Sequence, residues 1–283
     1  MMSKQEEKVA ELFASLEEGV QDVYTSGKYQ RYLDAMANFH DYSARNILLI
    51  LMQRPEASLV AGFNTWKNEF NRHVLKGEKA LTIIGGRQQK ITVEEVNEKT
   101  NEKEKKEIKF TKFFPCSVFD VSQTEGDDLP SIADKLNGSV DGYANLWETL
   151  VDISPVPVEV GECGGANGFY RRCEAPFIRV QDGMSEQQTV KTLLHEIAHA
   201  TLHAGDDAPG QRAREVEAES VAYVVSGRLG IDTSAYSFGY VAGWASGKEA
   251  KELQESADRI REAVHDLINR LGGLNGATFE QVA

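Results

Sequence analysis

The most constraining feature of the sequence is a pair of histidines, His195 and His199, in the stretch LLHEIAHATLH. Residues four apart lie on one face of an α-helix, about 6 Å from each other, so both imidazoles can bind one ion. Ser185 and Gln188 have capping-box spacing and predict that this helix begins there. The carboxylate of Glu196, beside a ligand, can reach a water molecule on the ion and accept its proton as a general base.

A catalytic zinc ion needs a third protein ligand and an open position. His203 is a poor candidate, because it lies about 12 Å along the helix axis from His195. The next predicted helix carries three acidic candidates, Glu215, Glu217 and Glu219. On a helical wheel Glu215 lies nearest the buried face, so we predict it as the third ligand, with Glu217 and Glu219 as alternatives. Glu219, one turn further on, is predicted to accept a hydrogen bond from a ligand histidine.

Such a site would be completed by a group that stabilises the developing oxyanion, a role that tyrosine can take. Three tyrosines lie in or after the acidic helix: Tyr223, Tyr236 and Tyr240. The sequence does not choose among them, and each also fits as a packed aromatic residue.

Composition narrows the class of protein. Of the 283 residues 41% are hydrophobic and 27% are charged, as in globular proteins. No apolar run approaches the ~20 residues of a membrane span, and the start MMSKQEEKVAELF lacks the character of a signal peptide. The three cysteines form no CxxC pair, which argues against a disulfide framework or a cysteine-rich zinc site. These features predict a cytoplasmic protein with no membrane partner.

Charge is distributed unevenly along the chain. The formal net charge is −13, yet residues 45–90 hold 8 basic residues against 3 acidic ones. Basic residues interleaved with aromatic ones are typical of single-stranded nucleic acid binding, in which cations follow phosphates and rings stack on bases. We predict DNA contacts from Arg45, Trp66, Lys67, Arg72, Lys76 and Lys79. The alternative is that the rings, Trp66 among them, belong to the core and the lysines are solvated.

The order of helical and strand-like segments predicts a two-domain protein of the α+β class. Domain limits are predicted at 1–125 and 143–283, with a linker over 126–142. The first domain is expected to begin with helices up to about residue 52, followed by strands near 80–84 and 108–124. Residues 94–109, which are nearly all polar, are predicted as a solvated hairpin tip or a flexible insertion. The second domain is expected to contain a short sheet and helices over 185–204, 211–229 and 249–271.

The acidic helix after HEIAH resembles the gluzincin pattern through Glu215 and Glu219, although that pattern usually has Asp or Asn at the second position. LLHEIAHATLH with EVEAESVAYVV is similar to the ImmA/IrrE-type metallopeptidases and to the related domain of ArdC-type antirestriction proteins. The resemblance implies a zincin fold with bound Zn²⁺ and a sheet beside the metal helix. Its edge strand, which we place at 177–180, would take a peptide by strand addition.

The first half of the chain is similar to the amino-terminal domain of ArdC-type proteins, over about residues 41–126. The similarity lies in YSARNILLILMQ, then VAGFNTWKNEFNRHVLKGEKALTIIGG, then FPCSVFDVSQTEG, with Tyr42, Asn46 and Trp66 in order. It implies a domain that binds single-stranded DNA, with double-stranded DNA as an alternative partner, and it adds Asn46 to the predicted DNA-binding residues.

Together these features favour a zinc metallopeptidase-type protein that also binds single-stranded DNA and acts in antirestriction or establishment of a mobile genetic element. A protein or peptide would be its substrate. Two alternatives stay open. One is a DNA-binding protection protein whose zinc site is not proteolytic, and the other is a plain peptidase whose first domain binds protein. The general base Glu196 favours a protease, and the basic surplus of residues 45–90 favours a DNA partner.

Overall fold

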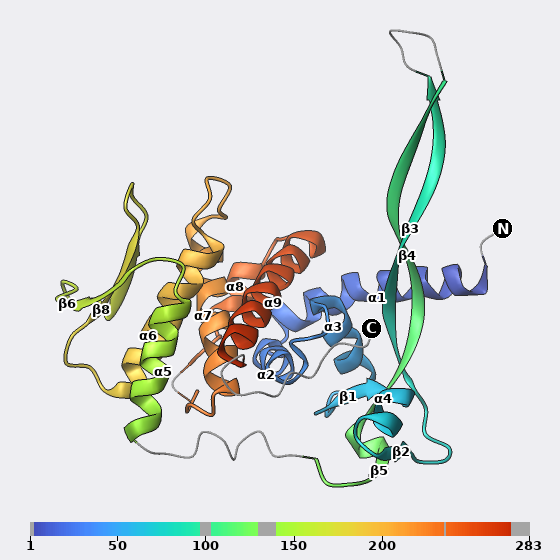
Figure 1. The fold of residues 1–283 in the computed structure, drawn as a ribbon, viewed down its shortest axis with the longest axis horizontal. Helices are drawn as coiled ribbons and strands as arrows, with labels where there is room; N and C mark the ends of the chain where they lie inside the picture. The colour runs from blue at the N-terminus through green and yellow to red at the C-terminus, as the bar shows by residue number, and fades with distance from the viewer. Residues whose placement is uncertain (1–2, 97–102, 130–139, 235, 273–283) are drawn as a thin grey trace.

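The computed structural model describes residues 3–96, 103–129, 140–234 and 236–272 of the chain (Figure 1). Both helices and strands are abundant, which confirms the predicted α+β class. A membrane-crossing helix, one of sufficient length and apolar character, does not occur in these ranges.

The chain begins with three helices, as predicted. They are α1 (Lys4–Thr25), α2 (Tyr29–Phe39) and α3 (Ala44–Gln53). Ser3 and Glu6 form a capping box at the start of α1, and the Ser43 side chain accepts a hydrogen bond from the Asn46 amide at the start of α3. These caps satisfy backbone amides that the first helical turn leaves without partners.

A long antiparallel ribbon dominates the next segment. It consists of β3 (Leu81–Val96) and β4 (Lys103–Asp120), which pair from Leu81 and Val118 out to Val96 and Lys103. β1 (Val60–Gly62) pairs with the base of β4, and the ribbon extends away from the helices (Figure 1). The described part of 94–109 lies in these two strands, so the hairpin alternative is the correct one. Residues 97–102 lie outside the described residues.

Smaller elements surround the base of the ribbon. They are α4 (Phe63–Asn68), the short helix η1 (Val121–Gln123), and the two-stranded sheet of β2 (Arg72–Val74) with β5 (Thr124–Gly126). Asn71 adopts a positive φ of 50° just before β2, a conformation that asparagine tolerates better than most residues.

The second half contains a three-stranded sheet and the remaining helices. The strands are β6 (Val158–Gly161), β7 (Gly168–Arg171) and β8 (Phe177–Gln181), in the order β6-β8-β7. The helices are α5 (Val140–Ile153), α6 (Glu186–Leu202), α7 (Gln211–Arg228), α8 (Val241–Ala245) and α9 (Ala250–Gly272). β8 has partners on both sides, so the prediction that 177–180 forms the edge strand is wrong. Alternating burial reveals which face of a strand is covered, but it does not reveal how many strands lie beside it.

One continuous apolar core joins the two halves. It runs from α1, α2 and α3 into α6, α7 and α9, and α7 contacts α2, α6 and α9. Polar contacts follow the same path: the Tyr29 hydroxyl lies 2.8 Å from Ser220 Oγ, and the Tyr223 hydroxyl donates to Asp34 at 2.6 Å. The predicted linker does not separate two cores. Its residues 130–139 lie outside the described ranges, and the domain limits stay a prediction.

Candidate metal centre

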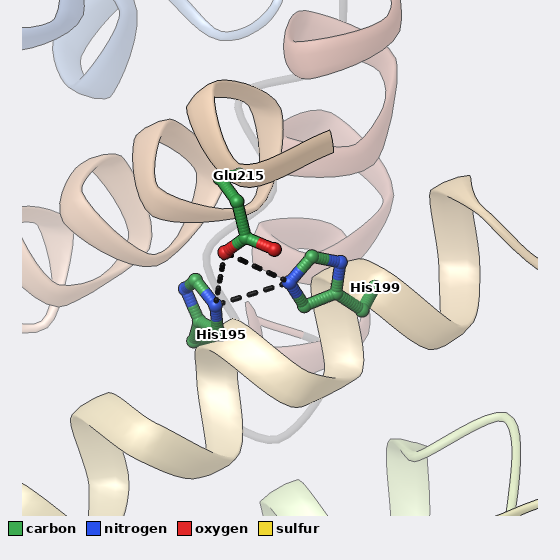
Figure 2. Close-up of side chains that lie close together, drawn as sticks. All are labelled: His195, His199 and Glu215. Carbon is green, nitrogen blue, oxygen red and sulfur yellow. Dashed lines mark hydrogen bonds and ion pairs between the residues drawn. The ribbon is translucent and has the colours of Figure 1, made fainter. Parts of the chain in front are cut away.

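Three side chains from two helices converge on one point (Figure 2). His195 and His199 lie one turn apart on α6, and their Nε2 atoms are 3.1 Å apart. Glu215 reaches them from α7, with Oε2 3.6 Å from each Nε2 atom. Ligand atoms bound tetrahedrally at about 2.0–2.1 Å are separated by about 3.3–3.4 Å. The three atoms therefore fit a divalent metal ion without large movement.

The negative charge of Glu215 lies next to the two histidines and favours the protonated form of His195. Burial lowers the pKa of His195, but the adjacent carboxylates of Glu215 and then Glu219 outweigh this effect and raise that pKa to about 9. Hydrogen bonds from His195 and then His199 hold the pKa of Glu215 well below its usual range. Glu215 is also the exposed member, with 51% of its side chain accessible, so the site opens to solvent on its side.

Glu219 lies one turn beyond Glu215 on α7. Its Oε2 atom is 3.2 Å from Nδ1 of His195, the ring nitrogen that faces away from the other ligands. A carboxylate at this position holds the proton on Nδ1 and leaves Nε2 free for a metal ion. The structure thus places Glu219 where the sequence predicted it, beside a ligand histidine.

Glu196, next to His195 on α6, is buried, with 7% of its surface exposed. Burial raises the pKa of its carboxyl group, whereas His195 and His199 oppose the rise. The backbone of Tyr170, in β7, also lowers the pKa of this carboxyl group. A cavity of about 330 Å³ lies beside it, bordered by His195, Glu196, Gly168 and Glu219. The edge strand next to the site is therefore β7, not the predicted 177–180.

Gly168 allows β7 to lie this close to α6. A Cβ atom on Gly168 would lie 2.6 Å from Cγ2 of Thr192 and 3.0 Å from the Arg179 carbonyl oxygen. Real side chains do not make contacts as short as the first of these, and Thr192 is a buried residue with little freedom to move. A glycine is therefore required for the approach of the strand to the metal helix.

A buried chain of hydrogen bonds extends behind His199. Nδ1 of His199 lies 3.1 Å from Nδ1 of His203, and Nε2 of His203 lies 3.0 Å from Glu217. Glu217 is fully buried and accepts hydrogen bonds from Ser256 and Arg259 of α9. When Nε2 of His199 binds a metal ion, its Nδ1–H donates a hydrogen bond to Nδ1 of His203. The Nε2–H of His203 in turn donates a hydrogen bond to Glu217.

This arrangement removes Glu217 from the choice of third ligand. Its carboxylate is engaged by His203 and Arg259, away from the three converging side chains. His203, which the sequence excluded as a ligand on distance, instead supports the ring of His199. The supporting role of His203 could have been predicted from the sequence, because His203 follows His199 by four residues on the same helix.

Comparison with protein families identifies both halves. Residues 3–119 match the N-terminal domain of anti-restriction factor ArdC, and residues 164–227 match the IrrE N-terminal-like domain of a peptidase family. The chain is thus similar to the ArdC-type antirestriction proteins in its first half and to an IrrE-like peptidase domain in its second half. The IrrE-like match contains both histidines of α6 and the acidic residues of α7, so the metallopeptidase-like domain includes the centre described above.

Individual proteins are also similar to this chain. An uncharacterized protein of Bacillus anthracis is 28% identical over 273 residues, which is 83% of this chain and 46% of that protein. The chain thus spans about half the length of this relative. Crystal structures of the antirestriction ArdC protein from the R388 plasmid, metal-free and Mn(II)-bound, are 19% and 18% identical. The matches cover 82% and 84% of this chain and 86% of each of those chains, with TM-scores of 0.48 and 0.47.

The three tyrosines occupy different environments. The Tyr223 hydroxyl is engaged by Asp34 and Gln30 of α2, and its ring packs edge to face on Tyr236. Tyr236 borders the cavity, and burial raises its pKa to about 12. Tyr240 is 48% exposed, and its pKa is raised to about 12 by burial and then by Glu219 and Glu215. Tyr240 is therefore within electrostatic range of the acidic residues of the centre.

Two of the predicted DNA-binding residues are parts of the fold. Trp66 is fully buried, and its Nε1–H donates to the Phe119 carbonyl oxygen at 2.9 Å. Asn46 is buried and binds both the N–H and the carbonyl oxygen of Ile84. The prediction of DNA contacts is corrected for both, since neither side chain is presented at the surface. A local pattern of rings and cations does not show which rings the tertiary structure covers.

The other predicted DNA-binding residues are spread over several elements. Arg72 binds Thr124 and the Gly126 carbonyl oxygen between β2 and β5, and Arg45 pairs with Asp258 of α9 at 3.2 Å. Lys67, Lys76 and Lys79 are exposed and form no ion pair with other described residues. Of the predicted DNA-binding residues, these three lysines are the ones whose side chains remain available to contact DNA.

Proposed function

We propose that this ArdC-type protein is a zinc-dependent metallopeptidase that also binds single-stranded DNA and acts as an antirestriction or establishment factor of a mobile genetic element. The observation that carries the enzymatic part is the convergence of His195, His199 and Glu215 next to the buried carboxylate of Glu196. A site that only stabilises the fold would be closed and would have no use for a general base.

The donor set favours zinc. Two imidazoles and one carboxylate in tetrahedral arrangement, with a fourth side open to solvent, are typical of catalytic zinc. His195, His199 and Glu215 would hold the ion, which would supply a Lewis acid and lower the pKa of a bound water molecule. Glu219 and His203 keep the protons of the two ligand histidines on Nδ1, so each ring presents Nε2 to the ion.

Glu196 is the proposed general base. Burial raises the pKa of its carboxyl group, which makes the carboxylate a stronger base for taking a proton from water and returning it to the leaving amine. A peptide would lie along the free edge of β7, which borders the cavity at Gly168, and strand addition would align its backbone with Glu196.

The DNA-binding part rests on the first half of the chain. Residues 3–119 match the N-terminal domain of an anti-restriction factor, and residues 45–90 carry a basic surplus in an acidic protein. Single-stranded DNA is the partner that the resemblance to this family implies.

A cleavage assay tests the enzymatic proposal. The full chain, loaded with zinc, is incubated with a diverse peptide mixture and the products are identified by mass spectrometry. The expected result is cleavage that Glu196→Gln abolishes while the zinc content stays near that of the parent chain. Absence of cleavage by the zinc-loaded parent, together with retained DNA binding, would assign the chain to the alternative of a DNA-binding protection protein.

A further inference from the structure

The outer part of the β3–β4 ribbon has no packing partner in the described structure. We define the ribbon stem as residues 86–92 and 107–113, the last stretch for which the side chains are described. At its base Phe113 meets Phe13 of α1 edge to face, with the ring centroids 5.5 Å apart. Beyond that contact the two strands pair only with each other and extend away from the body (Figure 1). A two-stranded ribbon is only marginally stable in water on its own, which favours a binding partner that covers this surface.

Large hydrophobic side chains are exposed on this stem. Ile91 is 46% exposed, Ile108 43%, Phe110 38% and Phe113 43%. Ile91 and Ile108 are directly opposite each other, and Phe110 is opposite Gln89. Opposite residues of an antiparallel pair share a face, as do residues two apart along one strand. Ile91, Ile108 and Phe110 therefore form one apolar patch on a single face.

The same face carries cations. Arg87 lies opposite Lys112, two residues along the strands from Gln89 and Phe110. On the other face Lys90 lies opposite Lys109, and Glu107, the acidic residue of the stem, is 3.5 Å from Lys90. Arg87, Lys109 and Lys112 form no side-chain hydrogen bond or ion pair with other described residues. The stem is thus cationic, although residues 116–283 hold 27 acidic residues against 13 basic ones.

We infer that the ribbon stem is the surface through which the chain binds single-stranded nucleic acid. The inference rests on the proposed DNA binding and gives it a location that the sequence-based patch did not include. Phe110 lies beside Arg87 and Lys112 on a face that no other described element covers. Single-stranded nucleic acid binds to such surfaces, because the cations follow the phosphates and the ring stacks on a base. Lys112 lies within electrostatic range of Glu6 of α1, but an apolar protein partner would supply no counter-charge to Arg87.

The contact is assigned to the stem, not to the ribbon tip. Residues 93–106 hold five acidic and four basic residues, so the tip offers no surplus of positive charge to a polyanion. A variant in which Asn-Gly replaces residues 93–106 tests this assignment. Thr92 and Glu107 are paired, so a two-residue hairpin turn can join them. The shortened chain should keep the nucleic acid affinity of the parent, and a loss of affinity comparable to that of the stem variants would overturn the assignment to the stem.

The test uses the full chain and a fluorescent twenty-nucleotide oligo(dT), with affinity measured by anisotropy over a range of salt concentrations. Phe110→Ala should weaken binding about 5- to 150-fold and leave the salt dependence unchanged, as expected for one lost stacking contact. Arg87→Gln with Lys112→Gln should reduce the slope of log affinity against log salt by up to about 1.4, or about 0.7 per contact.

The matched control is Lys251→Gln with Arg270→Gln, which removes two exposed charges from α9 and should change neither quantity. Circular dichroism confirms that each variant is folded. If the parent binds and both stem variants bind as tightly, the stem inference fails while DNA binding stands. If the parent does not bind at low salt, the proposed DNA function itself fails. Tighter binding of a duplex of the same length, lost in the same variants, would overturn the single-stranded assignment in favour of groove binding.

Discussion

Glu215 and Glu217 are two residues apart on α7 and face different partners. Glu215 is half exposed and reaches the two histidines, whereas Glu217 is fully buried and bound to His203 and Arg259. The helical wheel selected Glu215 because it assumed a single buried face. That premise is wrong, since α7 is covered by α2, α6 and α9 together. The residue at the site is the one predicted, but the reason is its position toward α6 and not its depth.

The first prediction compares these two residues. Glu215→Ala should remove most of the zinc affinity, because it deletes a ligand. Glu217→Gln should keep the ligands and lower the affinity about 10–100-fold, because the support of His199 through His203 is weakened. Competition with a chromophoric chelator measures both. A greater loss of zinc in Glu217→Gln than in Glu215→Ala would contradict the assignment of the third ligand.

The second prediction concerns pH. The pKa of His195 is about 9 without metal, so zinc binding below that pH must displace a proton from it. The apparent zinc affinity should rise about tenfold per pH unit between about 6.5 and 8.5 and level off above about 9. Calorimetry in buffers of different ionisation heat counts the displaced protons. Affinity independent of pH over this range would show that Glu215 and Glu219 do not hold the proton on His195.

The sign of the stability effect follows from the same shift. The folded pKa of His195 lies above its unfolded value, so its protonation stabilises the metal-free fold fully below about 6.5. That stabilisation is lost as the pH rises through about 9. The metal-free chain should therefore unfold at a lower urea concentration at pH 9 than at pH 6.5, as far as this group determines the difference.

At the scale of elements, sequence periodicity predicted the helices well but did not predict the order of the strands within the sheet. Caps at Ser43 and Ser185 and the apolar spacing after them predicted where α3 and α6 begin. The neighbours of β8 could not be predicted, because the strand order β6-β8-β7 depends on how the sheet packs on α6. The buried state of Trp66 was open for the same reason. Tertiary contacts decide what local patterns leave undetermined.

The third prediction tests the contact of β7 with α6. Gly168→Ala should lower the free energy of unfolding by about 1–3 kcal/mol, because the added methyl group forces β7 away from Thr192 and the Arg179 carbonyl oxygen. The same displacement should reduce peptide cleavage, since β7 borders the cavity beside Glu196 at Gly168. Gly142→Ala in α5 is the control: apart from its chain neighbours and the backbone of its own helix, nothing lies within 4 Å of the added methyl group. Equal unfolding free energies for Gly168→Ala and the parent would show that the close approach is not needed.

At the scale of the molecule, the helices of the first half and the metal helices are one packed body. Arg261 of α9 donates to the backbone carbonyl oxygens of Tyr42 and Asp41, in addition to the contacts of Tyr29 and Tyr223 with their partners. The sequence divided the chain at a linker, but an apolar core is built from both sides of it. Two family matches in sequence therefore do not imply two independent folding units.

The fourth prediction follows from this shared core. Zinc should slow amide hydrogen exchange in α2 as well as in α6 and α7, because α2 packs on the helix that carries Glu215. Urea unfolding should show one transition that zinc shifts as a whole. Protection confined to α6 and α7, with a separate transition for the first half, would show that the two halves fold independently.

The central claim is that His195, His199 and Glu215 hold one zinc ion, and metal analysis of the purified chain tests it most directly. The account predicts about one zinc ion per chain, a strongly reduced content in His195→Ala and in His199→Ala, and an empty site in the double variant. A double variant that is folded and keeps a full equivalent of zinc would contradict it.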